Sequence, residues 1–207
     1  MTQRVFSFRT GFSSLAILIF ALFLLSPLKY LADDANDSMP MPIGIGLIEP
    51  IQFPNVDTDI MGFRFNLLYG RNANVMGLDL GVLGCAVDGS IIGIQTSVFM
   101  NTVGSANGAL QLSGIANNSI EDFLGLQLSG IINMSDEDVY GGQLSSINLA
   151  RETYGLQIGV YNQAEKVYGI QIGVINYAKA MEGFQIGLVN IITEGPCPFL
   201  ILFNASF

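Results

Sequence analysis

Apolar and small residues alternate along the C-terminal half of the chain, in short units that resemble one another. The clearest copies are Gly155-Leu-Gln-Ile-Gly-Val-Tyr-Asn162, Gly169-Ile-Gln-Ile-Gly-Val-Ile-Asn176 and Gly183-Phe-Gln-Ile-Gly-Leu-Val-Asn190. Aliphatic residues take every second position, and Gly or Gln takes most positions between them. A period of two predicts a β-strand with one aliphatic face and one face of small and polar side chains. The density of glycine excludes a helix.

One glutamine marks each unit, and its spacing is regular. The successive separations are 16, 16, 16, 14, 14 and 14 residues for Gln95, Gln111, Gln127, Gln143, Gln157, Gln171 and Gln185. Asp79, in Gly77-Leu-Asp-Leu-Gly81, lies 16 residues earlier, and Arg64, in Gly62-Phe-Arg-Phe-Asn66, takes the equivalent position one unit before that. Such a period indicates a repeat architecture.

The repeat length first suggests a membrane barrel. A unit of 14 to 16 residues can hold a strand of about ten residues and a turn, and a transmembrane β-strand has about 9 to 11 residues. Adding the flanking apolar segments gives about 12 strands, an even number like those of single-chain bacterial barrels. The expected fold class is therefore all-β, with an antiparallel up-and-down transmembrane β-barrel as the main expectation.

A parallel β-solenoid of 14–16-residue coils is the alternative. Each repeat would form one coil, with the Leu/Ile/Val face packed inward and the glutamines and asparagines stacked as ladders. The connections are all short and chemically alike, which favours the solenoid, because barrels usually have long loops at one end. Antiparallel pairing of the Gln157 and Gln171 strands would indicate a barrel, and parallel pairing a solenoid.

The N-terminus predicts export. A basic segment precedes the apolar run Leu15–Leu25, which is too short for a spanning helix of about 20 residues. We expect a signal peptide at residues 1–32, with an uncleaved anchor as the alternative. A short linker at residues 33–41 and a single β domain at residues 42–207 would follow.

Composition restricts the partners. The chain is 50% hydrophobic and only 12% charged, against about 25% charged in typical soluble domains. Five basic and 17 acidic residues follow residue 32, which leaves a net charge of −12. Such a balance argues against nucleic acid, which requires clustered Lys and Arg.

No catalytic, cofactor or metal site is predicted. The chain lacks histidine, which excludes Ser-His-Asp and Cys-His arrangements and removes the commonest zinc ligand. Acidic clusters such as Asp136–Asp138 lack the spacing of a calcium loop and are expected to be solvated turns. We therefore expect a protein that is not an enzyme. Cys85 and Cys197 could pair after export, but their spacing does not decide whether they do.

The regularly spaced row supplies the main functional hypothesis. In a barrel, Arg64, Asp79 and the seven glutamines from Gln95 to Gln185 would line the lumen. Uncharged amides would make a weakly selective lining, as in a small passive pore. In the alternative, the glutamines hydrogen-bond across a closed interior and only hold the barrel together. A second hypothesis is a surface interaction or structural protein, either solenoid or closed barrel, with an unidentified partner.

The chain ends in an alternating apolar segment that includes Phe199, Ile201, Phe203 and Phe207. It resembles the C-terminal strand signal that is recognised by the outer-membrane barrel assembly machinery. An ordinary core strand that happens to end in Phe is the alternative. The lipid bilayer of the outer membrane and the assembly machinery are therefore the expected partners.

The repeats also resemble a known family. The Gln-Ile-Gly-x-x-Asn and Gln-Leu-Ser-Gly copies, together with the segment Gly62–Val75, look like the surface-repeat proteins of spirochaetes and related Gram-negative bacteria. The resemblance covers nearly everything from Pro42 to Phe207. It implies a location in the outer membrane or at the cell surface, and it supplies no catalytic residues.

Overall fold

Strands make up nearly all of the regular structure in the computed structural model, which describes residues 39–207. The predicted signal peptide and most of the predicted linker lie outside these residues. The strands form one 14-stranded sheet. In order they are β1 (Met41–Ile48), β2 (Ile51–Phe53), β3 (Ile60–Asn72), β4 (Val75–Gly81), β5 (Gly84–Ser97), β6 (Met100–Ser113), β7 (Ala116–Ser119), β8 (Phe123–Ser129), β9 (Ile132–Ser135), β10 (Val139–Leu144), β11 (Ile147–Ile158), β12 (Tyr161–Ile172), β13 (Ile175–Ile192) and β14 (Phe199–Ser206).

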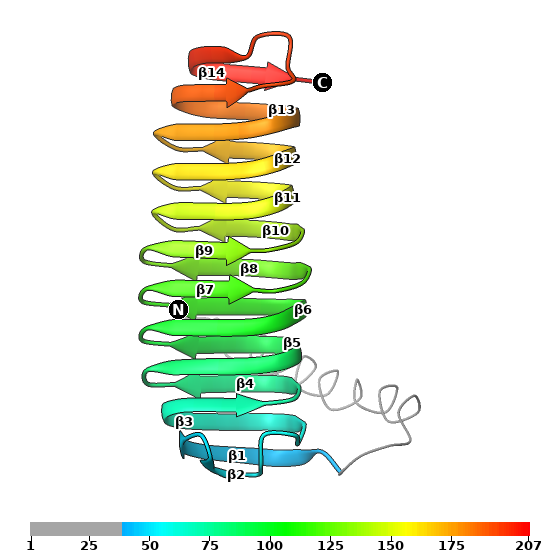
Figure 1. Cartoon of the computed structure of the whole chain (residues 1–207), viewed down its shortest axis with the longest axis vertical. Helices are drawn as coiled ribbons and strands as arrows, with labels where there is room; N and C mark the ends of the chain where they lie inside the picture. The colour runs from blue at the N-terminus through cyan, green and yellow to red at the C-terminus, as the bar shows by residue number, and fades with distance from the viewer. Residues whose placement is uncertain (1–38) are drawn as a thin grey trace, which may run out of the picture. The chain divides into compact units, whose positions relative to one another are not determined.

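Successive repeats pair in parallel and in register. Gln157 of β11 lies beside Gln171 of β12, which in turn lies beside Gln185 of β13. The chain therefore winds as a parallel β-solenoid, one repeat per coil, as Figure 1 shows. The all-β prediction is confirmed. The antiparallel barrel of about 12 strands is wrong, because each repeat turns through two corners and returns to run in its original direction.

The two sides of the strands are oriented opposite to the expectation for the solenoid. In the coil that begins at Gly155, the side chains of Gln157 and Asn162 are fully buried, at 0% exposure. Leu156 and Ile158 lie on the outer side and are partly exposed. The predicted inward Leu/Ile/Val face is therefore wrong, since the amide ladders occupy the interior.

Coil spacing explains why amides can fill the interior. Neighbouring strands in a sheet lie about 4.8 Å apart, so a side-chain amide can reach the equivalent amide of the next coil. Each buried amide thus finds a partner, which removes most of the cost of burying a polar group. Apolar residues fill the rest of the interior, with one cluster that includes Ile91, Phe123 and Val139 and a second that includes Val167 and Met181.

The first glycine of the unit is required by the backbone. Gly155 has φ +143°, and the equivalent Gly141 and Gly169 have φ +136° and +147°. A Cβ atom on Gly155 would lie 2.0 Å from the carbonyl oxygen of Gly141 in the preceding coil. Both the conformation and the close stacking of coils therefore exclude a side chain.

The longer coils differ from the shorter ones at their corners. Six positions separate Gln127 from Asn133, whereas five separate Gln157 from Asn162. A second extra residue lies in the connection that leads into the next coil. The 14-residue coils continue through that connection as single strands, such as β12. Among the 16-residue coils, β6 is also continuous, whereas the next coil is divided into the shorter strands β7 and β8.

The two ends are closed in different ways. At the N-terminal end, β1 pairs in parallel with β3 and antiparallel with the three-residue β2. At the C-terminal end, β14 pairs antiparallel with β13. The two ends of the stack are thus formed by β2 and β14.

Candidate functional site

The predicted lumen-lining residues form a single buried row. All are 0 or 1% exposed. Gln111 Nε2 donates to Gln95 Oε1 at 2.9 Å and Gln171 Nε2 donates to Gln157 Oε1 at 2.7 Å, with equivalent bonds between the other neighbours. The prediction that these residues share one side is correct. They line no barrel lumen, because the fold is a solenoid and the row is closed by side-chain hydrogen bonds.

An ion pair terminates this glutamine row at its N-terminal end. Gln95 Nε2 donates to Asp79 Oδ2 at 3.0 Å. Arg64 approaches Asp79 from the other side, with Nε to Oδ1 at 2.7 Å and Nη2 to Oδ2 at 2.5 Å. Burial opposes the charge of Arg64, but the Asp79 carboxylate more than offsets this and raises the pKa of the guanidinium. Arg64 and Asp79 therefore form a buried, bidentate ion pair that ends the row.

A second amide row runs beside the glutamine row, as the solenoid alternative predicted for the asparagines. It consists of Asn101, Asn117, Asn133, Asn148, Asn162, Asn176 and Asn190, all 0 or 1% exposed. Asn162 Nδ2 donates to Asn176 Oδ1 at 2.9 Å and to the Ile172 carbonyl at 2.9 Å. The Asn follows the glutamine by six residues in the 16-residue units and by five in the 14-residue units, and this regular spacing was the signal in the sequence.

The two rows run in opposite directions. Each glutamine donates to the preceding coil, whereas Asn117 Nδ2 donates to Asn133 Oδ1 in the following coil at 3.0 Å. Bonds from the same amide nitrogens to backbone carbonyls, such as Asn117 Nδ2 to Leu128 O at 2.8 Å, fix these orientations. Each row therefore ends on an acceptor without a hydrogen-bond partner among the described residues, Gln185 Oε1 in one and Asn101 Oδ1 in the other.

Outward-facing aliphatic and aromatic side chains form an extended surface that follows the strands of the glutamine row. We call this surface the apolar face. Its exposed members include Phe63, Phe65, Leu78, Ile94, Leu126, Leu144, Ile170, Ile172, Phe184 and Ile186, each between 36 and 52% exposed. The sequence predicted the alternation but assigned these side chains to lipid around a barrel or to a dry core. In the solenoid they lie outside, and nothing within residues 39–207 covers them.

The apolar face continues around one corner of the coils. We call this corner the apolar edge, and it comprises Val82, Leu83, Val98, Phe99, Ile115, Ile131, Val160, Val174 and Leu188, which are 38 to 59% exposed. Even the corner amides are paired along the stack, as Val160 N donates to Ser146 O at 2.8 Å and Val174 N to Val160 O at 3.0 Å. The edge thus presents apolar side chains over a hydrogen-bonded backbone.

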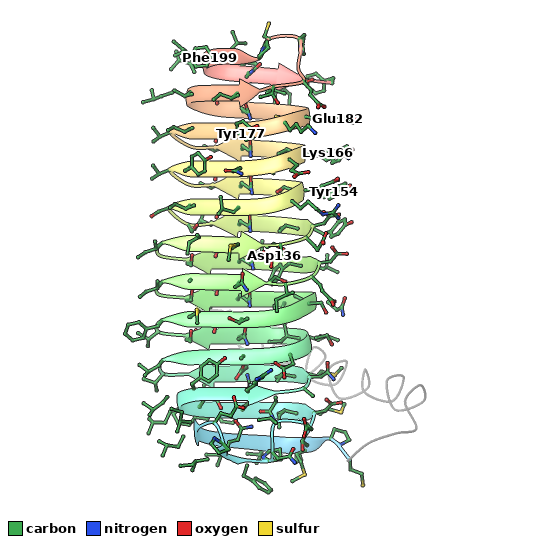
Figure 2. All side chains as sticks on the ribbon, viewed as in Figure 1. Asp136, Tyr154, Lys166, Tyr177, Glu182 and Phe199 are labelled. Atoms are coloured by element: carbon green, nitrogen blue, oxygen red, sulfur yellow. The ribbon has the colours of Figure 1, made fainter. Side chains whose placement is uncertain are left out.

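Charged side chains lie at the opposite corner of the coils. This charged edge comprises Asp88, Glu121, Asp122, Asp136, Glu137, Asp138, Arg151, Glu152, Glu165, Lys166, Lys179 and Glu182. Figure 2 shows Glu182, Lys166 and Tyr154 along one side of the stack, with carbon-rich side chains along the other. The sequence predicted solvated acidic turns but not their alignment on a single edge.

Three tyrosines stack beside the charged edge. The ring centroids of Tyr140, Tyr154 and Tyr168 are 4.7 Å apart in succession, with interplanar angles of 9° and 7°. Tyr154 donates its hydroxyl to Glu152 at 3.0 Å, and this bond together with burial raises the pKa of Tyr154 to about 12. Lys166 bonds to the same carboxylate at 3.0 Å. Each ring covers one face of the next, while Tyr140 and Tyr168 at the two ends of the stack remain 38% and 36% exposed.

Three residues of the predicted assembly signal, Phe199, Ile201 and Phe203, lie on β14, and Phe207 follows its last residue. Phe199, Ile201 and Phe203 are 50 to 64% exposed, and Phe207 is 87% exposed. Phe203 and Phe207 pack near Phe184 of the apolar face, with ring centroids at 5.8 and 5.2 Å. β14 therefore extends the apolar face to the end of the stack.

Other candidate chemistry is sparse in the described part of the chain. Cys85 is buried and Cys197 exposed, and the two are unpaired. Residues 39–207 contain no cluster of three or more metal-ligating side chains. Within the same residues, no helix has the length and apolar character needed to cross a membrane.

The geometry defines a β-solenoid whose interior holds two amide rows and two apolar clusters, and whose exterior has an apolar side and a charged edge. Comparisons with protein-family models, curated proteins and solved structures found no match to this chain.

Proposed function

We propose that the protein is a non-catalytic envelope protein that binds the surface of a lipid bilayer through its apolar face and apolar edge. The observation that carries the proposal is the separation of the exterior into an uncharged apolar side and a charged edge. This takes up the interaction-protein hypothesis rather than the pore, because the glutamine row is filled by its own hydrogen bonds.

The size of the apolar surface supports the proposal. Nine coils from β3 to β13, at about 4.8 Å each, give a length of roughly 40 Å. The outer strand and the adjoining corner are about 25 Å wide, so the surface covers on the order of 1,000 Å². The largest apolar patch on a typical monomer is about 300–600 Å². A surface of this extent indicates an apolar partner.

Backbone pairing favours lipid as that partner. Unpaired N–H and C=O groups are excluded from the hydrocarbon of a bilayer because water cannot satisfy them there. The corner amides of Val98, Val160 and Val174 all donate to the preceding coil at 2.8 to 3.1 Å. The apolar edge can therefore enter the acyl boundary without exposing orphaned backbone groups.

The positions of the charged side chains determine the orientation in which the protein would lie on the bilayer. With the apolar edge in the bilayer, the charged edge faces water, which is the arrangement adopted by amphipathic elements at membrane interfaces. The described residues carry more acidic than basic side chains, so hydrophobic contact rather than attraction to anionic headgroups provides the affinity. The family resemblance and the apolar N-terminal segment support an envelope location.

Flotation of the mature full-length protein with phosphatidylcholine vesicles tests the proposal. We expect the wild type to float and Val160→Asp/Val174→Asp to lose at least about tenfold in bound fraction, since each carboxylate would have to be desolvated. The matched control Gln163→Glu/Lys179→Gln makes the same change in net charge at exposed positions away from the apolar edge. It is expected to float like the wild type. A wild type that stays with the soluble fraction, or an edge variant that floats equally well, overturns the proposal.

A further inference from the structure

The outer edge of β14 has no strand beside it within residues 39–207. β14 pairs with β13 along one side only, from Phe199 beside Ile191 to Ser206 beside Gly183. It is the terminal strand of the sheet. An exposed strand edge carries a row of unpaired backbone groups that can template pairing with another chain.

The N-terminal end shows how such an edge is blocked. β2 has three residues and lies between Pro50 and Pro54. Gln52 Nε2 donates to the Arg71 carbonyl at 2.6 Å, and Arg71 N donates back to Gln52 Oε1. Short length and prolines are ordinary protections of an edge strand. The N-terminal end therefore discourages the addition of another strand.

β14 has none of these protections. It is eight residues long, contains no proline, and carries no charged side chain. Five consecutive residues are large, apolar and exposed, namely Phe199, Leu200, Ile201, Leu202 and Phe203, at 39 to 65%. A long, uncharged, apolar edge is stable in water only when something covers it.

We propose that a second copy of this chain covers it, through antiparallel pairing of β14 with β14 of the partner. Two identical strands pair antiparallel about a two-fold axis perpendicular to the sheet, which is the closed, self-complementary arrangement of most homodimers. This axis keeps both apolar faces on the same side. The two solenoids then form one continuous sheet, and Phe203 and Phe207 lie near its centre.

The area is sufficient for a stable contact. Six large apolar side chains, each contributing about 100 Å² of exposed surface, supply on the order of 600 Å². Main-chain atoms add to this, so the total approaches the ~800 Å² per partner of a standard interface. The residues of β14 on either side of Leu202, which has φ +71°, can also form backbone hydrogen bonds with the partner strand. The two proposals are tested at different residues, because strand pairing is tested at Ile201 of β14 and lipid binding at Val160 and Val174 of the apolar edge.

Sedimentation of the detergent-solubilised mature protein tests the pairing. We expect a dimer for the wild type and a monomer for Ile201→Lys, because each copy would bring a lysine charge into the apolar strand pair, where the charge would be desolvated. Ile51→Lys is the matched control, since Ile51 on β2 is 63% exposed and Ile201 is 64% exposed. It is expected to remain a dimer. The proposal is overturned if the wild type is monomeric at a concentration on the order of ten micromolar, or if Ile201→Lys is a dimer.

A spin label on Cys197 provides a second measurement. Cys85 is 1% exposed and burial raises the pKa of its thiol, so the label is directed to Cys197. We expect one label-to-label distance in the wild type and its loss in Ile201→Lys. Unchanged melting of Ile201→Lys relative to Ile51→Lys shows that the loss is not unfolding. A distance that persists in Ile201→Lys assigns the contact to another surface and rejects the proposal.

Discussion

The terminal amide groups of the glutamine row are hydrogen-bonded differently at its two ends. At the N-terminal end, the last amide donor meets Asp79, whose charge is balanced by the bidentate Arg64. At the C-terminal end, the Gln185 Oε1 acceptor has no hydrogen-bond partner among the described residues. A chain of amides has a direction, so its donor end and its acceptor end need different terminators. We therefore predict that substitutions lower the free energy of unfolding most at the N-terminal end of the row and less toward its C-terminal end.

The largest effect is expected at the charged terminator. Asp79→Asn leaves Arg64 buried at 1% exposure without a counter-charge. Removing one partner of a buried pair typically costs about 3–5 kcal/mol of unfolding free energy. Denaturant unfolding followed by circular dichroism measures the loss.

A double variant then tests whether the charge itself matters. Arg64→Gln/Asp79→Gln continues the amide row through both positions, so we expect most of the stability lost in Asp79→Asn to return. A double variant as unstable as Asp79→Asn would show that the shapes of Arg64 and Asp79, rather than their pairing, stabilise this end.

An intermediate effect is expected in the middle of the row. Gln127→Met keeps the length of the side chain but removes the donor to Gln111 and the acceptor for Gln143, which are both 2.9 Å away. Leaving two buried amide groups unsatisfied costs about 2–4 kcal/mol. The same unfolding experiment compares it with the next variant.

A smaller effect is expected at the open end. Gln185→Met removes the donor to Gln171 Oε1 at 2.8 Å and to the partly buried Ile191 carbonyl at 3.1 Å, but its own acceptor has no partner to lose among the described residues. We expect a loss of about 1–2 kcal/mol, below that of Gln127→Met. Equal losses for the two variants would contradict the directional account of the row.

The smallest effect is expected on the charged edge. The hydrogen bond from Lys166 lowers the pKa of Glu152. A carboxylate with a lowered pKa in the folded state contributes stability above its unfolded value, about 4.3, and loses it as the pH falls through the folded value. Glu152→Gln should therefore melt slightly below the wild type at pH 7 and lose slightly less stability on acidification. An unfolding loss as large as that of Gln127→Met would contradict the view that this pair is only a surface interaction.

The sequence was sufficient for the repeat and its strands. The spacing of Gln95 to Gln185 identified the residues that align, and the same alignment placed Arg64 and Asp79 in the row. The structure keeps every one of these positions in register. Spacing is a local property of the chain, so it is visible without knowledge of the neighbouring strands.

The sequence did not show which side of each strand faces the interior. Period two shows that Leu156 and Gln157 face opposite sides, but it does not show which side is inside. The usual expectation places the aliphatic side inside, and it fails here because a partner amide lies one coil away. Parallel or antiparallel pairing depends on the path through both corners, which the alternation within one strand does not record.

The opposed directions of the two amide rows have an electrostatic consequence for the length of the molecule. An amide carries a dipole of about 3.5 D, and aligned amides sum to a macrodipole in a helix. Here the glutamine donors point toward the N-terminal end and the asparagine donors toward the C-terminal end. Their fields largely cancel at each coil, so adding a coil lengthens the molecule without increasing an axial field. Duplication of one repeat is therefore an electrostatically neutral way for such a protein to change its size.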